Sequence, residues 1–348
     1  MGEGTFATLK NGDVMFAYTE YYDEGYSDHC KAHLMYCLSH DGGETWDDER
    51  LLLEKDGSAQ NYMSPSLARL PDGALGMVFL RKEYIDGQIT CMPVFTRSED
   101  EGRTWSAYVN CTDRLGYYCA INDGVCVSKD GRVLVPAAYY STDPDKVGGV
   151  VVILCSSDSG RTWNDLCGQI KSPFDDLVGL QEPGIYERED GTLWLWCRTA
   201  YGFQYDALSY DGGHSFTQMM PNFHFTSPDS PMRVKKVGKY TAAIFNPVAY
   251  SPVQRHGYEV SPDRTPLICA LSEDDGVSFC TKGTFRSKSF SEFGKNCYYI
   301  ESDRSDNYCY PCILPVSDGF LVSYYHSNGS DICLNCTKIV KIKYTEIN

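Results

Sequence analysis

A short motif recurs five times along this chain of 348 residues and constrains its fold more than any other feature. Each copy reads Ser-x-Asp-x-Gly-x, then Thr or Ser, then Trp or Phe. The copies are centred on aspartates spaced 53 to 63 residues apart, namely Asp41, Asp100, Asp158, Asp211 and Asp274. Repeats of this length are typical of propellers and solenoids, in which one supersecondary unit is copied along the chain.

The residue types of the motif predict a tight turn. The Asp carboxylate can accept backbone N–H groups of the turn, the Gly can adopt positive φ, and the closing aromatic ring can pack between sheets. We therefore expect each copy to stabilise a hairpin without touching substrate.

A second series of tight turns predicts one more repeat than the motif does. Six turn glycines are each followed by a strand-like run, such as ALGMVFL after Gly73 and TLWLWCR after Gly191. The six are Gly12, Gly73, Gly131, Gly191, Gly238 and Gly319. We predict an all-β chain forming a single domain over residues 1–348, a six-bladed β-propeller of four-stranded antiparallel blades, with the last sheet completed by a chain terminus.

The charge of the chain argues against two classes of partner. A formal net charge of −16 repels nucleic-acid phosphates and anionic membrane surfaces. No uninterrupted apolar window approaches 18 residues, and the first residues lack a basic segment followed by an apolar run. The sequence as it stands predicts a cytoplasmic protein; removal of an export signal would leave a secreted or periplasmic location open.

The sixteen cysteines are expected to be reduced thiols, with disulfides in an exported protein as the alternative. Twenty residues separate the pair Cys309 and Cys312 from the pair Cys333 and Cys336, a spacing that fits a zinc ribbon. Both pairs fall in strand-like runs, where residues three apart point to opposite faces. We therefore expect neither a metal nor any other cofactor.

Residues at one fixed offset from the turn glycines are all polar. Nine positions before each glycine stand Glu3, Ser64, Asn122, Glu182, Asp229 and Tyr310. Buried polar groups are costly without partners, so this pattern predicts a wet cavity at the mouth of the channel. Asp123, beside Asn122, is expected to line it as well.

The repeated motif resembles the Asp box of the sialidase (neuraminidase) superfamily, also called the BNR repeat, and the resemblance extends over the whole chain. It implies a tyrosine nucleophile assisted by a glutamate, an aspartate as acid/base, and three arginines that hold a sugar carboxylate. The matching positions are Tyr310, Glu182 and Asp28 for catalysis, with Arg198 and Arg264 as two of the arginines. His29 competes with Asp28 for the acid/base role.

The chain departs from this pattern at its first strand. Glu3-Gly4-Thr5-Phe6 stands where the superfamily has its first arginine, and Arg81 is the residue that could supply the missing cation. The resemblance implies a retaining glycoside hydrolase acting on an acidic sugar, either sialic acid or a related ulosonic or uronic acid. Two alternatives from other classes are a non-catalytic glycan-binding propeller and an interaction scaffold. A glycosidase or lyase with a non-sialic substrate is a third.

Overall fold

The computed structural model describes residues 2–23, 27–141, 148–173, 178–249, 264–279, 296–327 and 334–347. The chain folds into two compact units. The first unit comprises residues 1–197 and 205–220, and the second comprises residues 198–204 and 221–348.

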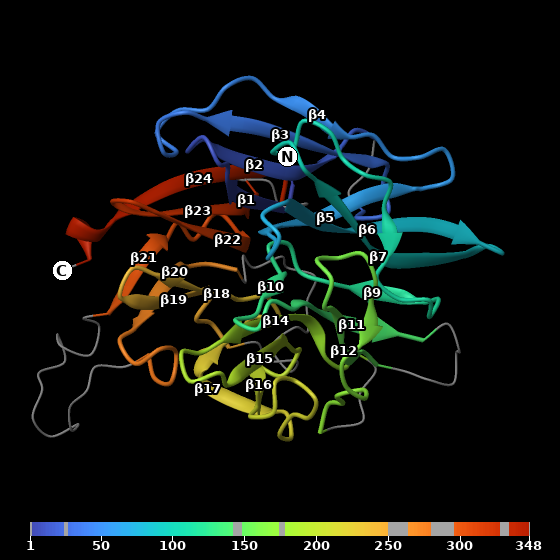
Figure 1. Cartoon of the computed structure of the whole chain (residues 1–348). Helices are drawn as coiled ribbons and strands as arrows, with labels where there is room; N and C mark the ends of the chain where they lie inside the picture. The colour runs from blue at the N-terminus through green and yellow to red at the C-terminus, as the bar shows by residue number, and fades with distance from the viewer. Residues whose placement is uncertain are drawn as a thin grey trace, which may run out of the picture. The chain divides into compact units, whose positions relative to one another are not determined.

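The strands follow one another as up-and-down meanders, in which most strands adjacent in the chain lie side by side (Figure 1); in the third group β9 and β10 both pair with β11. The first three groups are β1 (Gly4–Thr8), β2 (Val14–Tyr21), β3 (Ala32–Ser39) and β4 (Arg50–Leu53); β5 (Asn61–Arg69), β6 (Leu75–Ile85), β7 (Gln88–Ser98) and β8 (Val109–Asn110); and β9 (Tyr117–Cys119), β10 (Cys126–Val127), β11 (Val133–Tyr140), β12 (Val150–Ser156) and β13 (Asn164–Asp165). The others are β14 (Gln181–Glu187), β15 (Leu193–Arg198), β16 (Phe203–Ser209) and β17 (Met220–Thr226); β18 (Arg233–Val237), β19 (Tyr240–Phe245), β20 (Leu267–Ser272) and β21 (Cys297–Glu301); and β22 (Tyr308–Val316), β23 (Gly319–His326) and β24 (Cys336–Lys343).

The predicted all-β class is confirmed. In the described part of the chain the one helical element is a 3-10 turn, Tyr344–Glu346. Single parallel pairs, Ala32 with Asn61 and Cys91 with Tyr117, join the first three meanders into one continuous sheet. None of the helices in the described residues has the length and apolar character that a bilayer crossing requires.

All five copies of the repeated motif form the predicted turn. In each, the Ser hydroxyl donates to the Asp carboxylate at 2.7–2.8 Å. The N–H of the Thr or Ser four residues after the Asp donates to the same oxygen at 2.8–2.9 Å, and its hydroxyl donates to the other at 2.6–2.7 Å. Hydrogen bonds from the Thr104 backbone and hydroxyl lower the pKa of Asp100 to about 2.

Five of the six turn glycines have the expected positive φ. Gly12, Gly73, Gly131, Gly191 and Gly238 have φ between 56° and 93°. Gly319 differs, because it is the first residue of β23 and lies after a two-residue turn. A Cβ atom there would come within 2.1 Å of the Ile342 carbonyl oxygen, so close strand packing requires this glycine.

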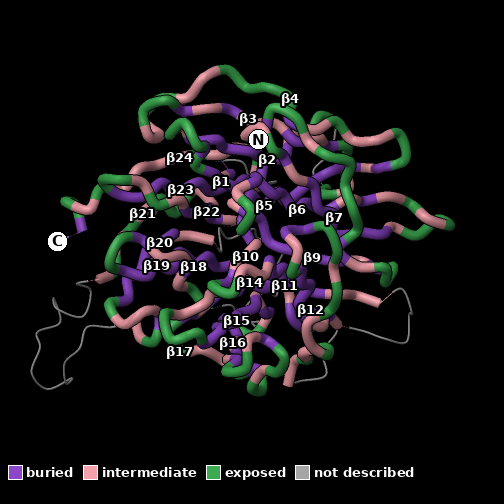
Figure 2. The backbone as a smooth tube through the Cα atoms, in the orientation of Figure 1, coloured by how far each residue is buried: buried purple, intermediate pink, exposed green. Residues whose placement is uncertain are grey.

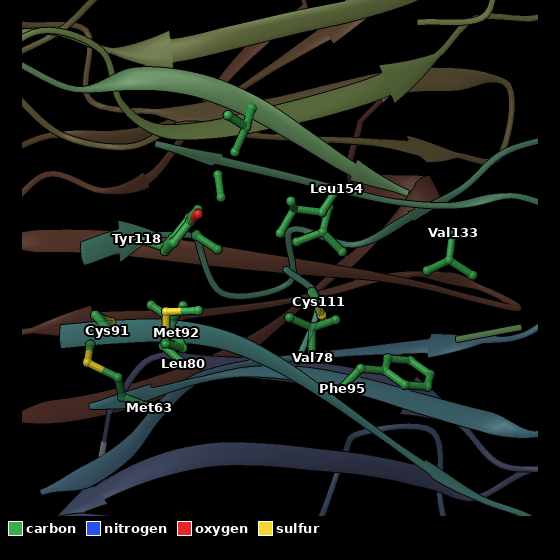
Figure 3. Packing of buried hydrophobic residues seen from close by; sticks show 14 of the residues in the cluster. Met63, Val78, Leu80, Cys91, Met92, Phe95, Cys111, Tyr118, Val133 and Leu154 are labelled. Carbon is green, nitrogen blue, oxygen red and sulfur yellow. The ribbon is translucent and has the colours of Figure 1, made fainter. Parts of the chain in front are cut away.

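Apolar side chains from neighbouring meanders form the core, and the central strands are the most buried (Figure 2). One cluster joins the second meander to the third, with Phe95 and Leu80 packing near Tyr118 and Leu154 (Figure 3). The motif aromatics contribute as predicted: the Trp163 ring lies 5.3 Å from Phe95 of the preceding meander. A corresponding cluster in the second unit joins β18–β21 to β22–β24.

Candidate functional site

The polar positions found by counting from the turns share an unusual backbone conformation. In five repeats the residue at or next to the predicted position has a φ between 40° and 62°, and it is not glycine. These residues are Ser64, Asp123, Glu182, Asp229 and Tyr310. In the third repeat it is Asp123, one residue after the counted Asn122.

Bulges account for this conformation where the strand register is known. The register shifts between Met63 and Ser66 on β5 and between Cys309 and Cys312 on β22. A proline follows the positive-φ residue in three repeats, at positions 65, 183 and 311. Bulges re-aim side chains beside active sites, and left-handed non-glycine residues persist only where the surroundings hold them. The shared offset therefore marks a recurring backbone conformation, which lies within a strand at Ser64, Glu182 and Tyr310 and outside the strands at Asp123 and Asp229.

In the second unit the fold brings together four of the predicted residues. Arg198 Nε donates to Asp229 Oδ1 at 2.8 Å, and Arg198 Nη1 lies 3.4 Å from the Tyr310 hydroxyl oxygen. Arg264 Nη2 donates to the Asp229 backbone carbonyl at 3.0 Å, and its guanidinium lies 5.8 Å from the centre of the Tyr310 ring. The Tyr310 hydroxyl thus lies beside Arg198 and the Tyr310 ring beside Arg264, and two arginines can hold an anionic group.

A buried amide fixes the segment that carries Arg264. Asn246 Nδ2 donates to the carbonyls of Arg264, Pro266 and Tyr308 at 2.8–3.0 Å. The Ser230 hydroxyl donates to Asn246 Oδ1 at 2.8 Å. Asn246 directly follows β19, eight residues after Gly238, and belongs to a second series of mostly polar positions that the count from the turn glycines identifies; it is not among the predicted binding or catalytic residues.

In the first unit Asp28 is paired with a buried lysine that the sequence patterns do not single out. Lys82 Nζ lies 2.7 Å from Asp28 Oδ2, 2.9 Å from the Asp28 carbonyl and 3.4 Å from His29 Nδ1. The Lys82 side chain is 1% exposed and that of Asp28 is 54% exposed. Burial alone would raise the pKa of Asp28, but the charge and hydrogen bond of Lys82 outweigh it and lower that pKa.

Two side-chain amides, one at the start of β5 and one just before it, hold the loop that carries Asp28 and His29. Asn61 Nδ2 donates to the carbonyls of Asp28 and Cys30, both at 2.8 Å, and Gln60 Nε2 donates to the His29 carbonyl at 2.7 Å. The Tyr117 hydroxyl lies 3.5 Å from Asp28 Oδ2. The carboxylate of this loop therefore has a fixed environment.

Glu3 is partly buried and accepts a short hydrogen bond from the Ser64 hydroxyl. Burial raises the pKa of Glu3 to about 7, with Glu182 and Asp28 acting in the same direction. The Ser64 hydrogen bond and the charge of Lys82 act against them. Glu182 and Asp28 are therefore near enough to Glu3 to act electrostatically on its carboxyl group.

Two other predicted residues make structural contacts with β1. Asn122 Nδ2 donates to the Gly4 carbonyl at 2.7 Å, and the Thr5 hydroxyl donates to Asp123 Oδ1 at 3.3 Å. Both Asn122 and Asp123 are buried. These contacts tie the start of β1 to the third meander.

Arg81 points to the other face of β6 from Lys82, as successive strand residues must. Its guanidinium makes a bidentate pair with Asp56 at 2.9 and 3.1 Å and lies 2.6 Å from Glu83. Its charge is thus already balanced by two carboxylates. The structure brings Lys82, rather than Arg81, to Asp28.

The cysteine pair on β22 corrects one step of the zinc argument. Because of the bulge, Cys309 lies opposite Tyr325 and Cys312 opposite Ser323, so the two cysteines share a face. Of the other pair, Cys333 lies outside the described residues. Over the described ranges, no group of three or more His, Cys, Asp or Glu side chains is arranged to hold a metal ion.

Comparison with known proteins agrees with this architecture. The model of the BNR repeat-like domain family matches residues 35–322. No curated protein sequence matches the chain significantly. Among solved structures, a Dyadobacter fermentans protein of unknown function has a TM-score of 0.71 and 17% identity, over 97% of this chain and 92% of that one.

Two trans-sialidases are similar in structure. The leech intramolecular trans-sialidase, in complex with 2,7-anhydro-Neu5Ac, has a TM-score of 0.69 and 13% identity, over 99% of this chain and 68% of that one. The Ruminococcus gnavus intramolecular trans-sialidase, in complex with oseltamivir carboxylate, has a TM-score of 0.68 and 12% identity, over 99% and 94%. With a family model that covers most of its length, the chain belongs to the BNR repeat-like domain family and has a sialidase-like fold.

Proposed function

We propose that the chain is a glycoside hydrolase of the sialidase type that acts on an acidic sugar, either sialic acid or a related ulosonic or uronic acid. The observation that carries this proposal is the group around Tyr310, whose hydroxyl oxygen lies 3.4 Å from Arg198 and whose ring faces Arg264. Two arginines suit a carboxylate ligand, since each guanidinium can donate two parallel hydrogen bonds.

In this mechanism Tyr310 attacks the anomeric carbon and the configuration is retained. A neutral phenol suits a sugar whose anomeric carbon bears a carboxylate, because a carboxylate nucleophile would meet like charge; sialidases are an exception to the usual pair of carboxylates for this reason. Glu182 and Asp28 take the roles that the resemblance implies, which are the base for Tyr310 and the acid/base for the leaving group.

The proposal includes the arrangement of the meanders as six blades of one propeller spanning residues 1–348. The sialidase-like neighbours support it through their fold, and two were solved with sugar-like or carboxylate ligands. The Asp-box turns also support it, because they recur at one place in successive meanders.

Tyr310→Phe tests the nucleophile. We expect it to lose more than about 10³-fold in kcat on a substrate found from a panel of methylumbelliferyl and nitrophenyl glycosides of sialic, ulosonic and uronic acids. Tyr299→Phe is the matched control, since Tyr299 is 74% exposed and lies on β21 of the same unit. Hydrolysis by Tyr310→Phe at the wild-type rate would rule out this mechanism.

A glycan-binding protein without turnover is the second candidate. The Arg198–Asp229 ion pair favours it, because part of the arginine charge is already balanced. Such a protein would bind an acidic glycan in calorimetry without releasing sugar, and Glu182→Gln would leave its affinity unchanged. Release of free sugar by the wild type decides for the hydrolase.

A further inference from the structure

Lys82 makes three contacts with the loop that carries Asp28 and His29. Its Nζ atom lies 2.7 Å from Asp28 Oδ2, 2.9 Å from the Asp28 carbonyl oxygen and 3.4 Å from His29 Nδ1. An ammonium group has three N–H donors and no acceptor, so each contact uses one donor. The Lys82 side chain is 1% exposed, and these three atoms therefore take the place of solvent around its charge.

The contact at His29 determines which ring nitrogen carries the proton. A neutral imidazole has one N–H donor and one acceptor nitrogen, and the partner of one nitrogen sets the state of the other. An unprotonated Nδ1 accepts from the Lys82 ammonium group, whereas a proton on Nδ1 would point at a group that can only donate. Asp28 Oδ1, the competing partner for an Nδ1 proton, is farther away at 3.7 Å. The geometry therefore favours the proton on Nε2.

The His29 ring is fixed by contacts on both sides of its backbone. The His29 N–H donates to Ser27 Oγ at 3.1 Å, and Gln60 Nε2 donates to the His29 carbonyl at 2.7 Å. The ring lies edge-on to that of Tyr117, with 6.2 Å between the centres. The side chain is 40% exposed, and because Nδ1 faces a buried ammonium group, the exposed edge carries Nε2. Within the part of the chain that the structure describes, Nε2 has no hydrogen-bond partner.

We propose that Lys82 fixes His29 as the Nε2–H tautomer, and that His29 uses this N–H to bind an oxygen atom of the aglycone, the part of the glycoside that leaves. The inference rests on the proposed function and deepens it, because it names the class of aglycone. Asp28 keeps its proposed role as acid/base. His29 is then a binding residue beside it, and Lys82 is a positioning residue that acts through His29.

The position of His29 beside Asp28 is the reason for assigning it to the aglycone. An acid that protonates the leaving oxygen must lie within hydrogen-bond reach of it, so the aglycone lies against the loop that carries Asp28. Lys82 is buried and cannot contact a ligand itself. A neutral N–H donor suits a hydroxyl or ether oxygen, and the favoured aglycone is therefore a second sugar.

The first test reads the protons on the ring nitrogens by NMR, in spectra of the full chain that correlate ring protons with ring nitrogens. At about pH 8, where histidines are ordinarily neutral, His29 should carry its proton on Nε2 and none on Nδ1. Loss of the signal in His29→Gln assigns it. Lys82→Met should add the Nδ1–H form, because Asp28 Oδ1 then becomes the partner of Nδ1.

Lys31→Met is the matched control for Lys82→Met. Lys31 belongs to the same loop, but its side chain is 53% exposed and its Nζ lies 3.9 Å from Asp23. This variant removes a positive charge near His29 without touching its ring, and it should keep the wild-type tautomer. A proton on His29 Nδ1 in the wild type overturns the proposal, and so does a Lys82→Met spectrum with the wild-type tautomer.

The second test compares His29→Asn with His29→Gln. The Asn amide stands near the place of Nδ1 and the Gln amide near that of Nε2, so Gln alone can replace the proposed donor. On a glycoside with a sugar aglycone, His29→Asn should lose about 3- to 10-fold in kcat/KM, the effect of one hydrogen bond, and His29→Gln should recover most of it. On the phenyl glycoside of the same acidic sugar, the loss in His29→Asn should be much smaller.

The outcomes separate this inference from the proposed function. Equal losses on the two substrates, or no recovery in His29→Gln, would mean that the ring is only structural and would overturn the inference. Failure of the wild type on every glycoside overturns the proposed function, whereas the spectra of the wild type and Lys82→Met decide the tautomer without turnover.

Discussion

Lys82 shows how a single residue can set the chemistry of a loop. Its ammonium group is buried on β6, whereas its partner Asp28 lies on a loop with half of its carboxylate side chain exposed. A buried cation without a partner is strongly unfavourable, so the ion pair ties the loop to the strand.

Lys82→Met should lower the free energy of unfolding by about 1–3 kcal/mol at neutral pH, a range discounted for the exposure of Asp28. Asp28 has a lowered pKa, so its contribution is present above its unfolded pKa and is lost as the pH falls through the folded value. The difference should shrink below about pH 4. Urea unfolding of both proteins at several pH values measures it, and a difference independent of pH would contradict an ionic role.

The sequence could identify Asp28, Glu182 and Tyr310 as candidates but not Lys82. Arg81 and Lys82 are adjacent in the chain, and strand register decides which of them faces the loop. Register depends on the bulge at Ser64 and on long-range pairing, neither of which a turn count contains. From the sequence alone Arg81 is the candidate for the missing cation, yet its guanidinium faces Asp56.

At the scale of the element, the motif turns combine local hydrogen bonds with packing between meanders. Gly160, in the third motif, has φ 85°, and a Cβ atom there would lie 2.0 Å from the buried Phe95 ring of the preceding meander. Gly191, a hairpin glycine, has φ 86° and would meet nothing within 4 Å. The two glycines therefore separate the conformational requirement from the packing requirement.

Gly191→Ala should cost about 1–2 kcal/mol of stability for the left-handed conformation alone. Gly160→Ala should cost about 1–3 kcal/mol more, because the added methyl group displaces Phe95. Denaturant unfolding of the two variants gives the difference. Equal losses would mean that the contact between meanders adds nothing at this turn.

The elements were predictable where one local rule determines them. The five motifs form their turns because the Asp, Gly and hydroxyl residues carry the whole hydrogen-bond pattern within seven residues or fewer. In the third repeat the positive-φ residue is Asp123, one position after the counted residue; it precedes Gly124, whereas Ser64, Glu182 and Tyr310 each precede a proline.

At the scale of the whole molecule, the proposed single domain makes a prediction about cooperativity. All five tryptophans, Trp46, Trp105, Trp163, Trp194 and Trp196, lie in the first compact unit. Tryptophan fluorescence therefore reports on that unit, and amide exchange in β18–β20 reports on the other.

A single domain should lose both signals at the same urea concentration, since two-state unfolding gives coincident transitions for different probes. Pulsed amide exchange read by mass spectrometry, alongside fluorescence, makes the comparison. Two separated midpoints would mean that the units unfold independently. The sequence predicts a number of repeats, but this coupling depends on packing that no repeat count describes.

The five positive-φ positions also bear on how such a chain can change its chemistry. The backbone at these positions has the same left-handed conformation, and a proline follows it in three repeats. The residue type differs between repeats, since Ser, Asp, Glu and Tyr each occur there. A new reaction can then arise by substitution of one residue at such a position, without a change in the surrounding sheet.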